Sequence, residues 1–159
     1  MRKKNFKKAV IGGTFETLHK GHLTLLKRAF ELGSVFIGLT SDEMAERLKK
    51  RKVKNFKERK KELERVIEKE FSIKPKIVKI EDRFGPTLKK DFDYIVVSPE
   101  TEKTALLINE KRKKLGKKPI EIVKVNFVLA ENEKPISDSR ILKGKIDRQG
   151  RLLEKLENG

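Results

Sequence analysis

The sequence predicts a single α/β domain over residues 1–159, built on an open, mostly parallel five-stranded sheet with helices on both faces. Short β-branched runs alternate with amphipathic helical patterns about five times along the chain. The unbroken apolar run Tyr94–Val97 is typical of a strand buried inside a parallel sheet. A chain of 159 residues is long enough to bury one core.

The first half of the chain begins with an apolar run from Ala9 that meets the double glycine Gly12-Gly13, where we expect a tight loop. Serine, threonine and aspartate at 40–42 are typical helix caps. The elements expected next are a helix over about 18–32 ended by Gly33, a strand over 34–39, helices over 42–50 and 57–70, and a strand over 76–80.

The second half contains a turn signal at Gly85-Pro86, after which residues 87–88 could begin a short helical turn. The elements expected after it are the strand over 94–97, a helix over 102–115 ended by Gly116, a last strand over 120–128 and a final helix over 136–143. The residues from about 147 onward form a polar tail.

Unusual segments follow the predicted strands at their carboxyl ends. They are residues 12–22 after the first strand, 40–42 after the second, 98–101 after the fourth and 136–140 after the fifth. Ligands of open parallel sheets bind beyond this edge, where the strand order reverses. We therefore expect the functional site to combine these segments.

The segment after the first strand has the features of a phosphate-binding loop. Its glycines allow close approach of a ligand, and the following helix offers unpaired N–H groups at its first turn. Both histidines of the chain, His19 and His22, lie there, and their spacing places them on one helical turn with Gly21 between them. A fortuitous pair, or half of a metal site, is the alternative interpretation.

The charge of the chain permits two explanations. A net charge of +17 and a pI near 10.0 are expected of a protein that binds nucleic acid. However, charged residues make up 41% of the chain, lysine mostly alternates with glutamate along the predicted helices, and this pattern is typical of thermophilic proteins. The most basic stretch is 49–54, and Phe56 is the only aromatic residue within 49–61, whereas nucleic-acid binding favours interleaved aromatics. We favour thermal adaptation.

Several functional classes are excluded by composition. The chain has no cysteine, which rules out disulfides, thiolate metal sites and thiol catalysis. No apolar run is long enough to span a bilayer, and the N-terminal residues do not resemble a signal segment. We expect a cytoplasmic protein that uses neither a membrane nor nucleic acid, and any metal must arrive with the substrate.

The loop also resembles a known motif. The segments Gly13-Thr14-Phe15-Glu16 and His19-Lys20-Gly21-His22 are similar to the nucleotide-binding motif of the nucleotidyltransferases with a His-x-Gly-His signature, with Glu16 where that family more often has aspartate. The segment Ile136-Ser137-Asp138-Ser139-Arg140-Ile141 is similar to the triphosphate-binding segment of the same family, in which a hydroxyl residue occupies the position of Asp138.

Further segments resemble the archaeal-type phosphopantetheine adenylyltransferases within that superfamily. They are residues 38–43, 96–102, 108–110 and 144–147, so the resemblance covers nearly the whole chain. It implies a Rossmann-like nucleotidyltransferase fold. It also implies transfer of AMP from ATP to 4′-phosphopantetheine, which gives dephospho-coenzyme A and pyrophosphate, with Mg²⁺ accompanying ATP and no metal ligand from the protein.

The resemblance suggests a role for each candidate site residue. We expect His22, His19 and Thr14 to be catalytic, and Thr14 together with one lysine, Lys52 or Lys54, to bind the phosphate of the acceptor. The expected nucleotide-binding residues are Gly13, Thr14, Phe15, His19, His22, Ser98, Glu100, Thr101, Ile136, Ser137, Ser139 and Arg140. The serines at 98, 137 and 139 could equally be plain helix caps.

The nucleotide motif alone leaves the acceptor open. The same fold and motif serve nucleotidyl transfer to glycerol phosphate, choline phosphate, nicotinamide mononucleotide or flavin mononucleotide, and only the resemblance over residues 96–102 favours 4′-phosphopantetheine. A basic nucleic-acid-binding protein remains the alternative outside the enzyme class. The evenly charged helices suggest no interface, so we expect a monomer or a small homo-oligomer.

Overall fold

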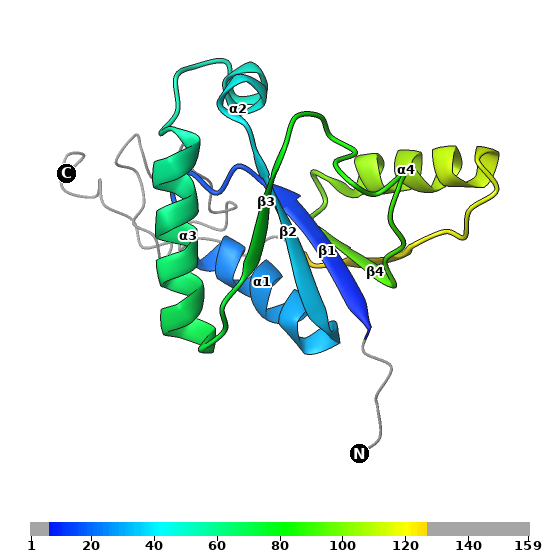
Figure 1. Ribbon diagram of the computed structural model, residues 1–159, viewed down its shortest axis with the longest axis horizontal. Helices are drawn as coiled ribbons and strands as arrows, with labels where there is room; N and C mark the ends of the chain where they lie inside the picture. The colour runs from blue at the N-terminus through cyan, green and yellow to red at the C-terminus, as the bar shows by residue number, and fades with distance from the viewer. Residues whose placement is uncertain (1–6, 127–159) are drawn as a thin grey trace, which may run out of the picture.

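The computed structural model describes residues 7–126, and Figure 1 shows how their helices and strands are arranged. The elements of this part follow the order β1 (Lys8–Gly13), α1 (Lys20–Leu32), β2 (Ser34–Thr40), α2 (Asp42–Lys49), α3 (Phe56–Phe71), β3 (Lys76–Ile80), β4 (Tyr94–Val97), α4 (Glu102–Lys114) and β5 (Glu121–Lys124). The predicted alternation of strand and helix is confirmed over these residues.

The strands form a five-stranded sheet in the order β3-β2-β1-β4-β5, and every neighbouring pair runs parallel. The chain first builds outward from β1 to β2 and β3, and then returns to the other side of β1 to form β4. The strand order therefore reverses between β1 and β4. The carboxyl ends of these two strands define the edge where a ligand of such a sheet binds.

The two faces of the sheet are covered by different helices. On one face, α1 and α3 pack on side chains that include Ile11 and Val96. On the other, α4 packs on their sequence neighbours Val10, Ile95 and Val97. Successive side chains of a strand point to opposite faces, so the apolar run 94–97 supplies both cores. In Figure 1, α3 and α4 lie on opposite sides of the strands, which confirms helices on both faces.

Side-chain caps fix where two of the helices begin. The Ser41 hydroxyl accepts the Met44 backbone N–H at 3.1 Å and starts α2. The Asn55 side chain accepts the Glu58 backbone N–H at 2.9 Å and starts α3. Each of these bonds pairs a backbone donor that a helix terminus otherwise leaves unpaired. The expected bounds of both helices are confirmed within one residue.

The double glycine lies in β1, and the prediction that it forms the loop is wrong. Gly12 pairs with Gly38 and Gly13 with Leu39 of β2, because β2 is long enough for the parallel ladder to continue past Ile11. The loop consequently spans residues 14–19. The first helix begins at Lys20 rather than near Leu18, because His19 caps it.

One expectation in the second half is confirmed and one changes. The Asp82 carboxylate accepts the N–H groups of Phe84 and Gly85, and the chain turns there with Gly85 at φ 49°. The Pro86 carbonyl then accepts the N–H groups of Lys89 at 3.0 Å and Lys90 at 2.8 Å, which is the short helical turn expected around residues 87–88. The last strand is Glu121–Lys124, shorter than expected, because its partner β4 has four residues. The predicted helix over 136–143 lies outside the described residues.

Candidate active site

The loop between β1 and α1 is shaped by the aromatic ring of Phe15. Phe15 is buried and adopts a left-handed backbone conformation with φ 46°, which is uncommon for a residue other than glycine. Its ring lies against Gly13, where an added Cβ would come within 2.9 Å of the ring atom Cε2. The absence of a side chain at Gly13 therefore makes room for the ring that holds the loop.

His19 and His22 cap the first turn of α1 reciprocally. Nδ1 of His19 accepts the Gly21 backbone N–H at 3.0 Å, and Nδ1 of His22 accepts the His19 backbone N–H at 3.2 Å. A ring nitrogen that accepts a hydrogen bond carries no proton, so in each neutral imidazole the proton lies on Nε2. The cap thus selects the tautomer of both rings.

The two imidazoles lie close together and keep His22 uncharged. Their rings stack at a centroid distance of 3.9 Å, and the Phe15 ring lies 5.2 Å from that of His22. Burial is the main cause that holds the pKa of His22 well below its usual range, and the electrostatic interactions with the neighbouring His19 ring and with Lys49 lower it further. Gly21 leaves room for the stack, since a Cβ there would lie 2.9 Å from Cε1 of His19.

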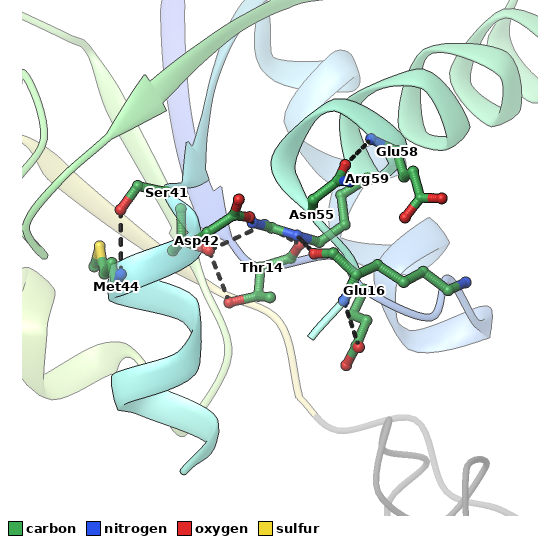
Figure 2. A network of polar contacts seen from close by, with 10 residues as sticks. Thr14, Glu16, Ser41, Asp42, Met44, Asn55, Glu58 and Arg59 are labelled. Atoms are coloured by element: carbon green, nitrogen blue, oxygen red, sulfur yellow. Dashed lines mark hydrogen bonds and ion pairs between the residues drawn. The ribbon is translucent and has the colours of Figure 1, made fainter. Parts of the chain in front are cut away.

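A buried polar network connects this loop to β2 and α3 (Figure 2). The Thr40 and Thr14 hydroxyl oxygens are 3.0 Å apart, and the guanidinium of Arg59 contacts Thr40 Oγ1 and the Thr14 carbonyl oxygen, each at 3.2 Å. Arg59 also donates to the Lys54 carbonyl at 2.7 Å and to the Asp42 carboxylate at 2.9 Å. Arg59 is fully buried, so this one cation joins four segments of the site.

Glu16 fastens the basic segment after α2 to the same loop. Its carboxylate, 5% exposed, accepts Nη2 of Arg51 at 2.8 Å, Nη1 of Arg51 at 3.3 Å and the Lys54 backbone N–H at 3.1 Å. Burial raises the pKa of Glu16, but the hydrogen bonds from Arg51 and Lys54, with the charges of Arg51 and Lys49, outweigh it and leave the pKa lowered. Glu16 is therefore an ionised anchor.

The anchor places both lysines expected at the acceptor phosphate near the loop. Lys54 is held through its backbone N–H, and the carbonyl of Lys52 accepts a hydrogen bond from Arg51 at 3.1 Å. Both residues are exposed. The structure thus attaches the segment that carries both lysines to Glu16, two residues after Thr14. The side chains of the lysines remain on the surface.

Comparison with known proteins identifies the family. Residues 10–144 match the cytidylyltransferase-like family. A phosphopantetheine adenylyltransferase of Methanosarcina acetivorans is 49% identical over 151 residues, which are 91% of this chain and 95% of that protein. One of Archaeoglobus fulgidus is 48% identical, with coverage of 92% and 99%.

The chain belongs to the phosphopantetheine adenylyltransferase family. The fold agrees with this assignment. A crystal structure from Archaeoglobus fulgidus, titled as a protein of unknown function, superimposes with a TM-score of 0.71 at 48% identity and covers 74% of this chain and 88% of that one. The predicted Rossmann-like nucleotidyltransferase fold is confirmed.

The segment 98–101, expected at the nucleotide of this adenylyltransferase family, follows β4 at the point where the strand order reverses. The Thr101 hydroxyl accepts the Ser98 backbone N–H at 3.1 Å and makes no side-chain cap to α4. Ser98 is half-buried, whereas Glu100 and Thr101 are exposed. The segment therefore forms its own tight turn. That its side chains bind the nucleotide stays a prediction.

The second expected nucleotide-binding segment lies outside the described residues. Ile136, Ser137, Ser139 and Arg140, together with the substitution Asp138, all fall beyond residue 126. Their assignment to the nucleotide site of the adenylyltransferase stays a prediction. The residues that the structure brings together are those of the loop 14–19 and the first turn of α1, with the ends of β2 and α3.

Sequence reasoning missed Arg59 and Arg51. Arg59 precedes Leu63 and Ile67 by one and two helical turns, and all three are fully buried on one face of α3. The position of Arg59 at four-residue spacing before two apolar residues therefore indicated, in the sequence alone, that α3 buries a charge. Arg51 had no such signal, because its partner Glu16 is 35 residues away.

Proposed function

We propose that the chain transfers the AMP group of ATP to the phosphate of 4′-phosphopantetheine and releases dephospho-coenzyme A and pyrophosphate. The observation that carries this proposal is the reciprocal capping of His19 and His22, which makes Nε2 the proton-bearing atom of both neutral rings. Two oriented N–H donors beside a helix N-terminus suit the oxygens of a triphosphate. The relatives of this family carry the named activity.

The reaction needs little acid–base chemistry from the protein. A phosphate monoester is largely ionised at pH 7, so the acceptor oxygen attacks the α-phosphorus without a general base. The new P–O bond forms as the bond from the α-phosphorus to the oxygen that bridges to the β-phosphate breaks. The electron pair of that bond leaves with pyrophosphate. Catalysis then consists of positioning and of stabilising charge on the α-phosphate oxygens.

The histidines act as hydrogen-bond donors in this proposal. His22, whose lowered pKa keeps the ring neutral, donates from Nε2 to an α-phosphate oxygen as negative charge builds there, and His19 assists it. A neutral donor is suited to this role because its proton is not lost during the reaction. The two rings are held by stacking and by the cap, so little reorganisation is needed.

The remaining residues bind the two substrates. Thr14 and the backbone at Gly13 and Phe15 orient the reacting phosphates. One lysine, Lys52 or Lys54, neutralises the phosphate of the acceptor, and the attachment of their segment to Glu16 supports this role. The residues proposed to hold the nucleotide on its far side are Ser98, Glu100 and Thr101 with Ile136, Ser137, Ser139 and Arg140.

Mg²⁺ is proposed to arrive with ATP. No three histidine, aspartate or glutamate side chains come together as metal ligands within residues 7–126, so the phosphates of ATP are the natural ligands of the ion, where it lowers the charge of the leaving pyrophosphate. In the same range no helix is long and apolar enough to cross a membrane. We propose a cytoplasmic enzyme that acts as a monomer or a small homo-oligomer.

The test is a product assay with the purified chain, ATP and Mg²⁺. With 4′-phosphopantetheine we expect dephospho-coenzyme A and pyrophosphate in equal amounts, and parallel reactions contain glycerol phosphate, choline phosphate, nicotinamide mononucleotide or flavin mononucleotide. A clear preference for one of these four would refute the proposed acceptor. Tight binding of a short DNA duplex with no product from any acceptor would refute the enzymatic function.

The role of His22 is tested in the same assay. We expect His22→Ala to lower kcat by about 10²- to 10³-fold, the usual effect of losing one oriented donor to a developing oxyanion. Lys27→Ala is the matched control, because Lys27 lies on the same helix and, among the described residues, forms only an exposed ion pair with Glu31. A folded His22→Ala protein with the kcat of this control would contradict the proposed role.

A further inference from the structure

The Arg59 network determines which way a hydroxyl group of the loop points its proton. Nη1 of Arg59 lies 3.2 Å from Thr40 Oγ1, and Thr40 Oγ1 lies 3.0 Å from Thr14 Oγ1. Arginine has only donors and is never deprotonated in proteins. At the first contact the hydroxyl oxygen of Thr40 must therefore be the acceptor.

The proton of Thr40 then has one acceptor. Thr40 is 2% exposed, and its hydroxyl contacts only Arg59 and Thr14 among the side chains and backbone of residues 7–126. If Thr14 donated to Thr40 instead, the Thr40 proton would be buried without an acceptor, which costs about 1–3 kcal/mol. The Thr40 hydroxyl therefore donates to Thr14.

The consequence reaches the hydroxyl of Thr14. A threonine hydroxyl has one proton, and the Thr14 oxygen already accepts from Thr40. Its own proton is thus left for a group outside this network, and that group has to be an acceptor such as a phosphate oxygen. Without the chain from Arg59, the Thr14 hydroxyl could rotate to accept or to donate.

The same guanidinium also fixes the backbone around this hydroxyl. Nη1 of Arg59 donates to the Thr14 carbonyl and Nε donates to the Lys54 carbonyl, while the Asp42 carboxylate holds Nη2. Figure 2 shows Arg59 between Asp42 and Thr14. A fully buried arginine is uncommon. Here its N–H groups donate to the loop, to β2 and to the segment that carries the basic residues.

We propose that Arg59 and Thr40 are positioning residues that lock the Thr14 hydroxyl as a hydrogen-bond donor to a phosphate oxygen of the bound substrates. This inference rests on the proposed function, in which Thr14 orients the reacting phosphates. Neither Arg59 nor Thr40 contacts substrate. They act through Thr14, because they exclude the orientation of its hydroxyl in which an oxygen lone pair faces the anionic phosphate.

The test is a double-mutant cycle with Thr40→Val and Thr14→Val, which change each hydroxyl to a methyl of similar size. We expect Thr40→Val to lower kcat about 10-fold, the equivalent of one lost hydrogen bond, with the KM for ATP changed by less than about twofold. Thr14→Val should lower kcat about 10²-fold, and the double variant should be no slower than Thr14→Val. Thr40→Ser, which keeps the hydroxyl, should recover most of the wild-type kcat.

The control is Thr24→Val, because within residues 7–126 the Thr24 hydroxyl bonds only to the Lys20 carbonyl of its own helix. It should leave kcat unchanged. A purely structural role for Thr40 predicts that Thr40→Val lowers kcat by the same factor with or without Thr14, and a multiplicative double variant would overturn the proposal. A Thr40→Val protein with wild-type kcat would overturn it as well.

The cycle separates this inference from the proposed function. If Thr14→Val is slow and Thr40→Val is not, the lock is wrong while Thr14 keeps its role. If the wild-type chain makes no dephospho-coenzyme A, the proposed function fails, and the cycle is then measured on the affinity for inorganic phosphate. Thr40→Val should weaken phosphate binding in the wild-type background but not in Thr14→Val, and equal weakening in both would refute the lock.

Discussion

Removal of the Glu16 carboxylate is expected to weaken both the fold and acceptor binding. In Glu16→Ala, Arg51 and the Lys54 backbone N–H lose three hydrogen bonds to a carboxylate that is 5% exposed. A hydrogen bond to a charged group contributes about 1.5–3 kcal/mol, but the Arg51 side chain is 33% exposed and can be rehydrated. We therefore expect a loss of about 2 kcal/mol in the free energy of unfolding.

The functional effect should be selective for one substrate. Without the Glu16 carboxylate, the segment that carries Lys52 and Lys54 loses its direct bond to the loop and keeps the bond from Arg59 to the Lys54 carbonyl. The segment is then less firmly held, so we expect the KM for 4′-phosphopantetheine to rise about 10-fold. The KM for ATP should change by less than about threefold. Glu16→Asp, with a shorter side chain, should fall between the wild type and Glu16→Ala in both quantities.

The effect also depends on pH in a defined direction. Because the folded-state pKa of Glu16 is lowered, its contribution to stability is present above the unfolded value of about 4.5 and is lost as pH falls through the folded pKa. The stability difference between wild type and Glu16→Ala should therefore be constant from pH 6 to 8 and should shrink below about pH 4.5.

The measurements are guanidinium chloride unfolding at several pH values and steady-state kinetics with each substrate varied. Glu31→Ala is the matched control, because Glu31 pairs with Lys27 and Arg28 at an exposed site and should cost less than about 0.5 kcal/mol. Equal unfolding midpoints for Glu16→Ala and Glu31→Ala, together with an unchanged KM for 4′-phosphopantetheine, would refute the reasoning.

Two further substitutions distinguish residues that shape the loop from residues that only stabilise the fold. Gly13→Ala adds a Cβ that would lie 2.9 Å from the Phe15 ring, so the ring must move; we expect ATP affinity, measured by titration calorimetry, to fall about 10-fold, and an unchanged affinity would contradict the described packing. Arg112→Met removes a buried guanidinium that donates to the carbonyls of residues 87, 90 and 118. It should lower the free energy of unfolding by about 3 kcal/mol and change kcat at 25 °C by no more than about twofold. A folded Arg112→Met protein whose kcat falls further than that would show that Arg112 serves the site.

The fold was predictable because its signals are local. The apolar run 94–97 and the amphipathic helices are readable from neighbouring residues, and the strands and helices that they predict within residues 7–126 are observed. The ends of elements were less predictable. The ladder of β1 continues through Gly12 and Gly13 because β2 lies beside it, and no feature within the first strand reveals the length of its partner.

The proximity of the candidate residues was predictable, but their hydrogen-bond partners were not. The motif places Thr14, His19 and His22 close together after the first strand, and the structure has them in the loop after β1 and in the first turn of α1. Arg59 is 45 residues from Thr14, and its contact with the Thr14 carbonyl depends on how α3 packs on the sheet. The direction of the Thr14 proton follows only from that packing, since a sequence pattern gives residue types and not hydrogen-bond partners.

If neutral imidazoles donate from Nε2 to the α-phosphate, nitrogen NMR of the two histidines should detect both the protonated ring nitrogen and its response to a bound nucleotide. The chain has only two histidines, so ¹⁵N-labelled histidine gives four ring signals. We predict that at pH 7 both rings are Nε2–H tautomers, that His22 stays neutral well below pH 6.5, and that a non-hydrolysable ATP analogue shifts the Nε2 signal of His22 more than its Nδ1 signal. A His22 ring that is protonated on Nδ1, or that titrates near pH 6.5, would contradict the account.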